Sequence, residues 1–124
     1  MRAMHSLRRS LWLAFVLSLV TASGFAQTPA PTFEPAVGQA GKDVVWVPTP
    51  QLLVDKMLDM AKVTKDDYVI DLGSGDGRTV ITAAKRGARA LGIEYNPYMV
   101  TLSQRNAAAA GVSDRATFVK ADIF

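Results

Sequence analysis

The sequence of 124 residues predicts an α/β fold, in which helices alternate with the strands of a parallel sheet. Three observations predict this fold. Short apolar runs of strand length alternate with helix-length segments, glycines follow the helical segments, and the connections are short. Because right-handed crossovers join such elements, we expect a parallel sheet with helices on both of its faces.

The first expected elements lie between residues 44 and 61. The segment VVWV (44–47) reads as a short extended stretch. Thr49 and Pro50 then supply an N-cap and a first-turn proline for a helix over residues 50–61. The inward face of this helix carries apolar residues at helical spacing, namely Leu53, Val54, Met57, Leu58 and Ala61.

Strands and helices then alternate to the end of the sequence. DYVIDL (67–72) is a continuous apolar strand of the kind buried on both faces, and RALGIEY (89–95) and ATFVKADIF (116–124) are the next two strands. Helices are expected over residues 77–86, with Gly87 as the stop, and from an Asn96–Pro97 cap to Ala110, with Gly111 as the stop. The inward residues of the helix over 77–86 are Val80, Ile81 and Ala84.

This order of elements makes half of a doubly wound sheet. The first strand would lie at the centre of a complete sheet, so that here it presents an unpaired edge. We therefore expect residues 44–124 to be a domain that is incomplete at its C-terminus, and the chain to be the N-terminal part of a longer protein.

Composition excludes several kinds of chemistry. The sequence has no cysteine, which excludes disulfides, thiolate nucleophiles and cysteine-bound metals. Its one histidine, His5, precedes the apolar N-terminal run, so a Ser-His-Asp triad and a histidine-bound zinc are excluded from the body. After Arg2, Arg8 and Arg9, eleven basic residues face eleven acidic ones. This neutral body does not indicate nucleic-acid binding.

Residues 1–26 read as a signal peptide. A short basic region is followed by an apolar run over 11–20, and Gly24 and Ala26 are placed for cleavage after Ala26. We therefore expect an exported or periplasmic protein, membrane-anchored if the segment is not cleaved. RRSLWL also resembles a twin-arginine signal, and a buried helix with a cytoplasmic protein is the remaining reading. Residues 27–43, rich in Pro, Gly and Ala, read as a linker without anchors.

A glycine-rich turn joins the first expected strand to the next helix, with the spacing Gly73-x-Gly75-x-Gly77. Such a turn lets a ligand approach the backbone at a helix N-terminus. The dinucleotide fingerprint needs a small residue where Arg78 stands. Asp71 and Asp76 would repel a pyrophosphate, so the turn favours a ligand with a cationic end.

Two further acids close the next two strands. Glu94 can accept hydrogen bonds from the ribose hydroxyls of a nucleoside, and Asp122 can accept one from an adenine amino group. Together with Asp71 they stand at the C-terminal ends of three consecutive parallel strands, where open α/β sheets bind ligands. The sequence therefore predicts a site for a cationic nucleoside cofactor.

The motifs VIDLGSGDGRTV, GIEYNP and FVKADIF resemble those of class I S-adenosylmethionine-dependent methyltransferases, over residues 46–124. The resemblance implies a Rossmann-like fold and S-adenosyl-L-methionine as the cofactor. It implies that Glu94 binds the ribose and Asp122 the adenine, with the Ile123 amide beside it. The glycine turn would hold the methionine end, with Asp71, Gly73, Ser74, Gly75, Asp76 and Gly77 as its cofactor-binding residues.

DLGSGDGR, AAKRG and the Glu94–Pro97 segment are most similar to protein-lysine methyltransferases of the ATP synthase c-subunit type. The VPTP segment also resembles theirs, which would place Thr49 at the cofactor carboxylate, although a plain N-cap explains Thr49 as well. Trp46 can roof the cofactor or cap the core. The resemblance implies a methyltransferase acting on a substrate nucleophile, which a protein lysine can supply, with catalytic residues beyond Phe124 and no metal. The alternatives are an NAD-binding oxidoreductase and an exported, non-enzymatic remnant.

Overall fold

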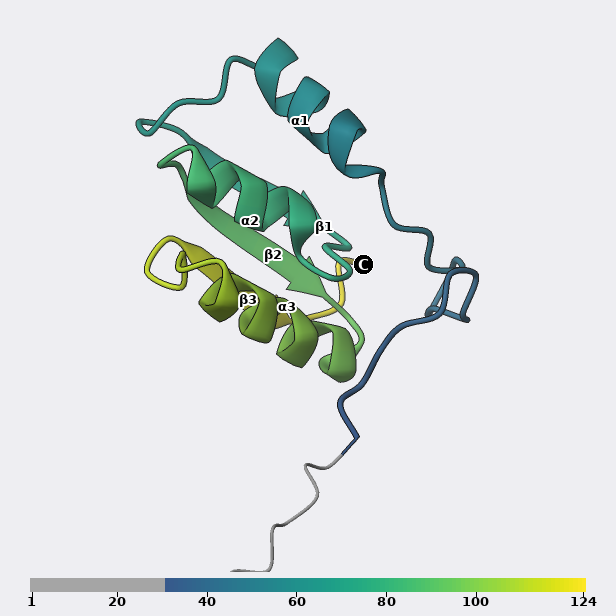
Figure 1. The fold of residues 1–124 in the computed structure, drawn as a ribbon. Helices are drawn as coiled ribbons and strands as arrows, with labels where there is room; N and C mark the ends of the chain where they lie inside the picture. The colour runs from purple at the N-terminus through teal and green to yellow at the C-terminus, as the bar shows by residue number, and fades with distance from the viewer. Residues whose placement is uncertain (1–30) are drawn as a thin grey trace, which may run out of the picture. The chain divides into compact units, whose positions relative to one another are not determined.

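The structure, a computed structural model, describes residues 31–124, so the predicted signal peptide and the first residues of the predicted linker lie outside it. Its elements follow the predicted order (Figure 1). They are α1 (Gln51–Met60), β1 (Tyr68–Leu72), α2 (Arg78–Lys85), β2 (Arg89–Glu94), α3 (Pro97–Ala109) and β3 (Ala116–Lys120). The third strand ends four residues earlier than predicted, and VVWV contributes only one bridge, between Ala40 and Val45.

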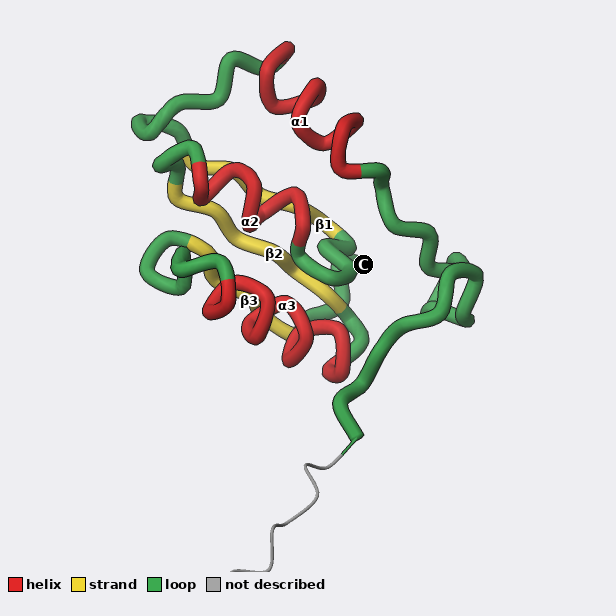
Figure 2. Tube along the Cα trace, viewed as in Figure 1, coloured by secondary structure: helices red, strands yellow, loops and turns green. Residues whose placement is uncertain are grey.

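The three strands form one parallel sheet in the order β1-β2-β3, as the tube view also shows (Figure 2). Ile70 pairs with Leu91, which in turn pairs with Thr117. This order places β1 at an edge of the described sheet, which confirms the expected edge position. The C-terminal ends of all three strands lie together at one end of the sheet.

The helices cover one face of this sheet, and the prediction of helices on both faces was wrong for residues 31–124. Figure 1 shows α2 and α3 side by side over the same face. Consecutive right-handed crossovers that advance in one direction, from β1 to β2 to β3, place their helices on the same side. Helices on the second face would require a change in the direction of strand order, which these three strands do not contain.

The pleat of the strands shows which residues meet the helices. Ala90, Ala116 and Phe118 are buried on the helix-covered face. On the opposite face Tyr68, Ile70 and Leu72 are 52–61% exposed, so the prediction that β1 is buried on both faces was also wrong. Their apolar character is that of a buried strand, but no described element covers them.

Helix α1 begins one residue later than expected and without the expected cap. Pro50, not Thr49, is the N-cap residue, and no side chain caps the helix. Val54 and Leu58 are buried in the core, whereas Leu53 and Met57, predicted to face inward, are about half exposed. The helix buries a narrower stripe than predicted because it packs against α2 alone.

Helices α2 and α3 end as the sequence indicates. Gly87 and Gly111 follow their last turns with φ of +92° and +70°, in the left-handed region that glycine enters without a Cβ penalty. At the start of α3, the Asn96 side chain accepts a hydrogen bond from the Tyr98 amide at 2.9 Å, which confirms the predicted cap.

Residues 31–47, which we call the strap, contact the folded body through several side chains. Phe33 stacks on Tyr98 with ring centroids 5.6 Å apart, and Glu34 pairs with Arg105 at 3.1 Å. The strap is folded back on itself, since the Trp46 amide donates to the Gln39 carbonyl at 2.9 Å. We predicted no anchors before residue 44, and these contacts correct that expectation for residues 31–43. Within residues 31–124, no helix has the length and apolar character needed to cross a membrane.

Candidate functional site

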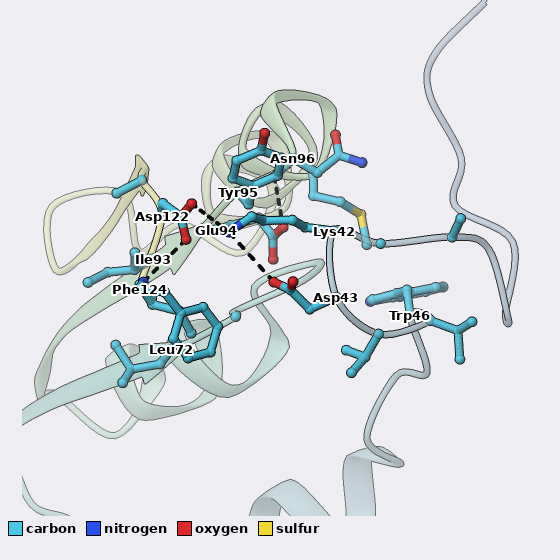
Figure 3. A pocket seen from close by; sticks show the side chains of 18 of the residues that line it. Lys42, Asp43, Trp46, Leu72, Ile93, Glu94, Tyr95, Asn96, Asp122 and Phe124 are labelled. Carbon is cyan, nitrogen blue, oxygen red and sulfur yellow. Dashed lines mark hydrogen bonds and ion pairs between the residues drawn. The ribbon is translucent and has the colours of Figure 1, made fainter.

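A cavity of about 380 Å³ lies where the strap meets the C-terminal ends of the strands (Figure 3). This volume falls in the range of about 300–1,000 Å³ that is usual for small-molecule sites. The walls come from the strap (39–47), the ends of β1 and β2 (72–73 and 93–96), Met99, and residues 121–124 after β3. The cavity therefore occupies the crevice in which open α/β sheets bind ligands.

The glycine loop, residues 73–77, joins β1 to α2 beside this cavity. Gly73, Gly75 and Gly77 have φ of +77°, +55° and +83°, which a residue with a Cβ rarely adopts. A Cβ on Gly75 would lie 2.7 Å from Nε1 of Trp46. The indole of the strap thus packs on the loop backbone, and there is no room for a larger residue between them.

Glu94, the last residue of β2, connects the loop to the cavity. Its Oε2 accepts a hydrogen bond from the Gly75 amide at 2.9 Å, and its Oε1 accepts one from the Asn96 amide at 2.9 Å. The residue also lines the cavity. Because each carboxylate oxygen has two acceptor sites, both oxygens keep capacity for donors on a ligand.

Asp122 lines the cavity from the segment after β3 and is held by the strap. Its Oδ2 accepts a hydrogen bond from Nζ of Lys42 at 2.6 Å, and its Oδ1 accepts one from the Phe124 amide. The Lys42 ammonium also lies over the rings of Tyr95 and Phe124, 5.3 and 5.6 Å from their centroids. The hydrogen bond from Lys42 lowers the pKa of the Asp122 carboxyl and raises that of Lys42.

Asp71 lies on the helix-covered face of β1, in register with Gly92. Burial raises the pKa of its carboxyl above the usual value, the Thr79 side chain opposes this shift, and the charge of Glu94 adds to it. Asp71 does not line the cavity. Its chain neighbour Leu72 does line the cavity, so Asp71 lies one residue away from the cavity wall.

Asp76, which the sequence predicts to favour a cationic ligand, is paired with Arg78 two residues later in the chain. Arg78 donates to both of its carboxylate oxygens, with Nη2 to Oδ2 at 2.6 Å. The same guanidinium donates through Nη1 to the Thr49 carbonyl at 2.8 Å. This guanidinium links the loop to Thr49, two residues before α1, and places a positive charge beside the Asp76 carboxylate.

The predicted site residues therefore fall into two groups. Those that line the cavity are Gly73, Glu94, Asp122 and Ile123. Those that lie beside it are Asp71, Gly75, Asp76, Gly77, Ser74 and Thr49. In the second group, the hydroxyl of Ser74 is buried with no hydrogen-bond partner in the described part of the chain, and it lies against Gly92. The roles of both groups of residues toward a ligand stay predictions.

Comparison with known proteins places the chain in a family. The model of the ANTKMT methyltransferase domain matches residues 71–124, from the end of β1 onward. A protein-lysine N-methyltransferase of Saccharolobus islandicus is 46% identical over 83 residues, which cover 65% of this chain and 52% of that protein. The human lysine N-methyltransferase of the ATP synthase c-subunit is 34% identical over 122 residues, 97% of this chain and 51% of that protein.

The chain belongs to the S-adenosylmethionine-dependent methyltransferases. A solved RNA methyltransferase from Salinibacter ruber, in complex with S-adenosyl-L-homocysteine, is 49% identical in sequence with a TM-score of 0.60. The match covers 61% of this chain and 50% of that one. The predicted family and Rossmann-like fold are thus confirmed. The chain spans about half the length of the curated relatives it matches.

The site fits the cofactor of this methyltransferase family. Adenosine offers ribose hydroxyls and an adenine amino group as donors, and the cavity presents the Glu94 and Asp122 carboxylates as acceptors. In residues 31–124, no group of three or more acidic or histidine side chains is arranged to hold a metal ion.

Sequence reasoning missed two cations of the candidate site, Arg78 and Lys42. Arg78 was noted only as a departure from the dinucleotide fingerprint, although its position two residues after Asp76 is a signal for a local ion pair. Lys42 lies 80 residues from Asp122 in an apparently featureless segment, and no pattern in the sequence connects the two.

Proposed function

We propose that the cavity at the strand ends binds S-adenosylmethionine, and that the protein transfers the methyl group of this cofactor to a protein lysine. The observation that carries the cofactor assignment is the position of Glu94. One carboxylate both lines the cavity and accepts the Gly75 amide of the glycine loop, so the loop and the acid form one unit. Membership of the methyltransferase family supports the same assignment.

Each end of the proposed site has its own chemistry. Glu94 accepts from the ribose hydroxyls, and Asp122, with the Ile123 amide beside it, accepts the adenine amino group. The backbone of the glycine loop holds the amino-acid end, where its left-handed residues permit close approach. The charge of Asp71 favours the cationic end of the ligand. These contacts bind and orient; none of them takes part in bond making.

The bound cofactor would supply an electrophilic methyl group on a sulfonium. The described residues contribute alignment, since the strap forms one wall of the cavity and its Trp46 packs on the glycine loop. Transfer to an amine also needs loss of the amine proton to a base. We assign no described residue to that step.

A protein lysine is the substrate that the comparisons support best. Protein-lysine methyltransferases are matched over 65–97% of this chain. The name of the Salinibacter relative supports RNA instead. The balance of charge favours the lysine substrate, because residues 31–124 contain eleven basic and eleven acidic residues, whereas RNA-binding surfaces are strongly basic.

Equilibrium binding tests the cofactor assignment. Titration of the chain with S-adenosylhomocysteine should give saturable binding, and NADH should give none. Glu94→Gln should weaken binding about tenfold or more, because an amide offers one acceptor oxygen in place of two. Asp114→Asn, at an exposed acid before β3, is the matched control and should bind as the wild type does. Saturable NADH binding without S-adenosylhomocysteine binding would contradict the proposal.

Tritiated methyl transfer tests the substrate. The protein, with the cofactor, is incubated with a proteome extract and with total RNA from the same cells. Label on lysine after acid hydrolysis of the protein fraction is the expected result. Label in the RNA fraction alone would replace the lysine assignment with the RNA one.

A further inference from the structure

Helix α3 donates two side-chain hydrogen bonds to consecutive carbonyls of the glycine loop. The Ser103 hydroxyl donates to the Gly75 carbonyl at 2.9 Å, and the Asn106 amide donates to the Asp76 carbonyl at 3.1 Å. The two residues are three apart and therefore lie on one face of the helix. This face of α3 contacts the glycine loop, although the bonded residues are 28 and 30 positions apart in the sequence.

The Ser103 hydroxyl makes this hydrogen bond and no other side-chain hydrogen bond among residues 31–124. Its side chain is fully buried. A serine inside a helix commonly donates back to the carbonyl four residues earlier, but here the hydroxyl donates out of the helix. Burial of a hydroxyl is unfavourable unless it is hydrogen bonded, so the Gly75 carbonyl and Ser103 depend on each other. A Cβ on Gly77 would lie 2.8 Å from the Ser103 Cβ, which shows how closely helix and loop approach.

The Gly75 residue is consequently held on both sides. Ser103 holds its carbonyl, and Glu94 holds its amide at 2.9 Å. Because Glu94 lines the cavity, the hydrogen bonds run from the core of α3 through the loop to the carboxylate at the ligand site. Loss of the Ser103 hydroxyl would free the Gly75–Asp76 peptide to rotate, and because Gly75 joins it to the Ser74–Gly75 peptide, the amide that Glu94 accepts would loosen with it.

We propose that Ser103, supported by Asn106, is a positioning residue for cofactor binding: it fixes the Gly75 carbonyl, and through the Gly75 backbone it fixes the amide that holds the Glu94 carboxylate. The proposal rests on the proposed function of the cavity. In this proposal Ser103 affects cofactor affinity without touching the cofactor, because α3 holds the glycine loop in place.

Ser103→Ala is the test, because alanine is the better helix former and removes only the hydroxyl. We expect S-adenosylhomocysteine affinity to fall about five- to tenfold, the change that corresponds to loss of one hydrogen bond. Asn106→Asp, which turns a donor into an acceptor against the Asp76 carbonyl, should lower the affinity in the same direction. Ala107→Gly is the matched control, since Ala107 is buried on the same helix and is not hydrogen bonded to the loop.

Two further measurements separate positioning from general stability. Without ligand, the Gly75 amide should exchange with deuterium at least fivefold faster in Ser103→Ala than in Ala107→Gly. In the Glu94→Gln background, Ser103→Ala should change affinity less than twofold, because the acid it positions is gone. Unchanged Gly75 exchange, or equal effects in both backgrounds, would overturn the positioning role. If the wild type binds no S-adenosylhomocysteine at all, the proposed function fails and this proposal fails with it. If the wild type binds and Ser103→Ala binds equally well, only the positioning proposal fails.

Discussion

At the scale of the residue, the site is built from acids in different electrostatic settings. Asp76 and Asp122 are paired with Arg78 and Lys42, whereas Asp71 and Glu94 have no basic partner among the described residues. The negative charge that can favour a cationic ligand is therefore concentrated at β1 and β2. In the sequence argument, Asp71 and Asp76 supplied the charge for a cationic ligand, whereas Glu94 and Asp122 served as hydrogen-bond acceptors.

Asp71→Asn should stabilise the protein at neutral pH. The folded-state pKa of this carboxyl is raised, so the native state binds more protons than the unfolded state, and stability falls as pH rises through the raised pKa. Urea denaturation at pH 3 and pH 7 checks this: the variant should gain on the wild type at pH 7 and match it at pH 3. A variant less stable at pH 7 would show that the Thr79 contact outweighs burial. The same change should weaken S-adenosylhomocysteine binding, a trade-off common at functional sites.

Lys42→Met should raise the affinity for S-adenosylhomocysteine severalfold. The ammonium of Lys42 occupies the Asp122 carboxylate and the space beside Tyr95 and Phe124, where we place the adenine. Methionine has a similar length and no charge. Calorimetric titration measures the change, with Lys56→Met on exposed α1 as the control for net charge. A loss of affinity would mean that Lys42 helps to close the cavity over the ligand.

At the scale of the element, we expect substitutions on the helix-covered face of the sheet to lower stability much more than substitutions on the uncovered face. Val80 is fully buried between α2 and the sheet, so Val80→Ala should cost about 2 kcal/mol through lost transfer energy and a cavity. Ile70 is 52% exposed on the uncovered face, and Ile70→Thr should change stability by less than about 0.5 kcal/mol. Chemical denaturation of both variants checks this. A large loss for Ile70→Thr would mean that this face is covered in solution.

The elements themselves were predictable because their signals are local. Asn96, Gly87 and Gly111 mark helix ends through backbone geometry that depends on a few neighbouring residues. Which faces of the sheet the helices cover could not be predicted from such local signals. β1 has the composition of a strand buried on both sides, yet the order β1-β2-β3 places helices on one side only.

The same distinction holds for the candidate site. Glu94 and Asp122 could be placed at the cavity because parallel strands bring their C-terminal ends together. Lys42 and Ser103 could not, since their partners lie 80 and 28 residues away and their own segments carry no motif. Side-chain contacts between distant segments depend on packing, which periodicity does not report.

At the scale of the whole molecule, the position of the strap shows whether removal of the predicted signal peptide would disturb the site. We propose that the protein is exported and cleaved after Ala26, a prediction that concerns residues outside the described part of the chain. The contacts of the strap begin at Phe33, which stacks on Tyr98. Cleavage after Ala26 therefore leaves every described contact of the strap in place, together with its wall of the cavity.

Expression in a Gram-negative host, followed by fractionation and intact-mass measurement, tests this proposal. The periplasmic protein should begin at Gln27 and should bind S-adenosylhomocysteine with the affinity of the cytosolic chain, because cleavage removes no cavity residue. Leu17→Arg should keep the protein in the cytosol at full mass, since a charge interrupts the apolar run. Conservative Arg8→Lys and Arg9→Lys changes should block export only if the twin-arginine route is used, and that route would carry the folded protein with its cofactor already bound. A wild type of full mass found in the cytosol would contradict export and would leave the methyltransferase site where its cofactor is made.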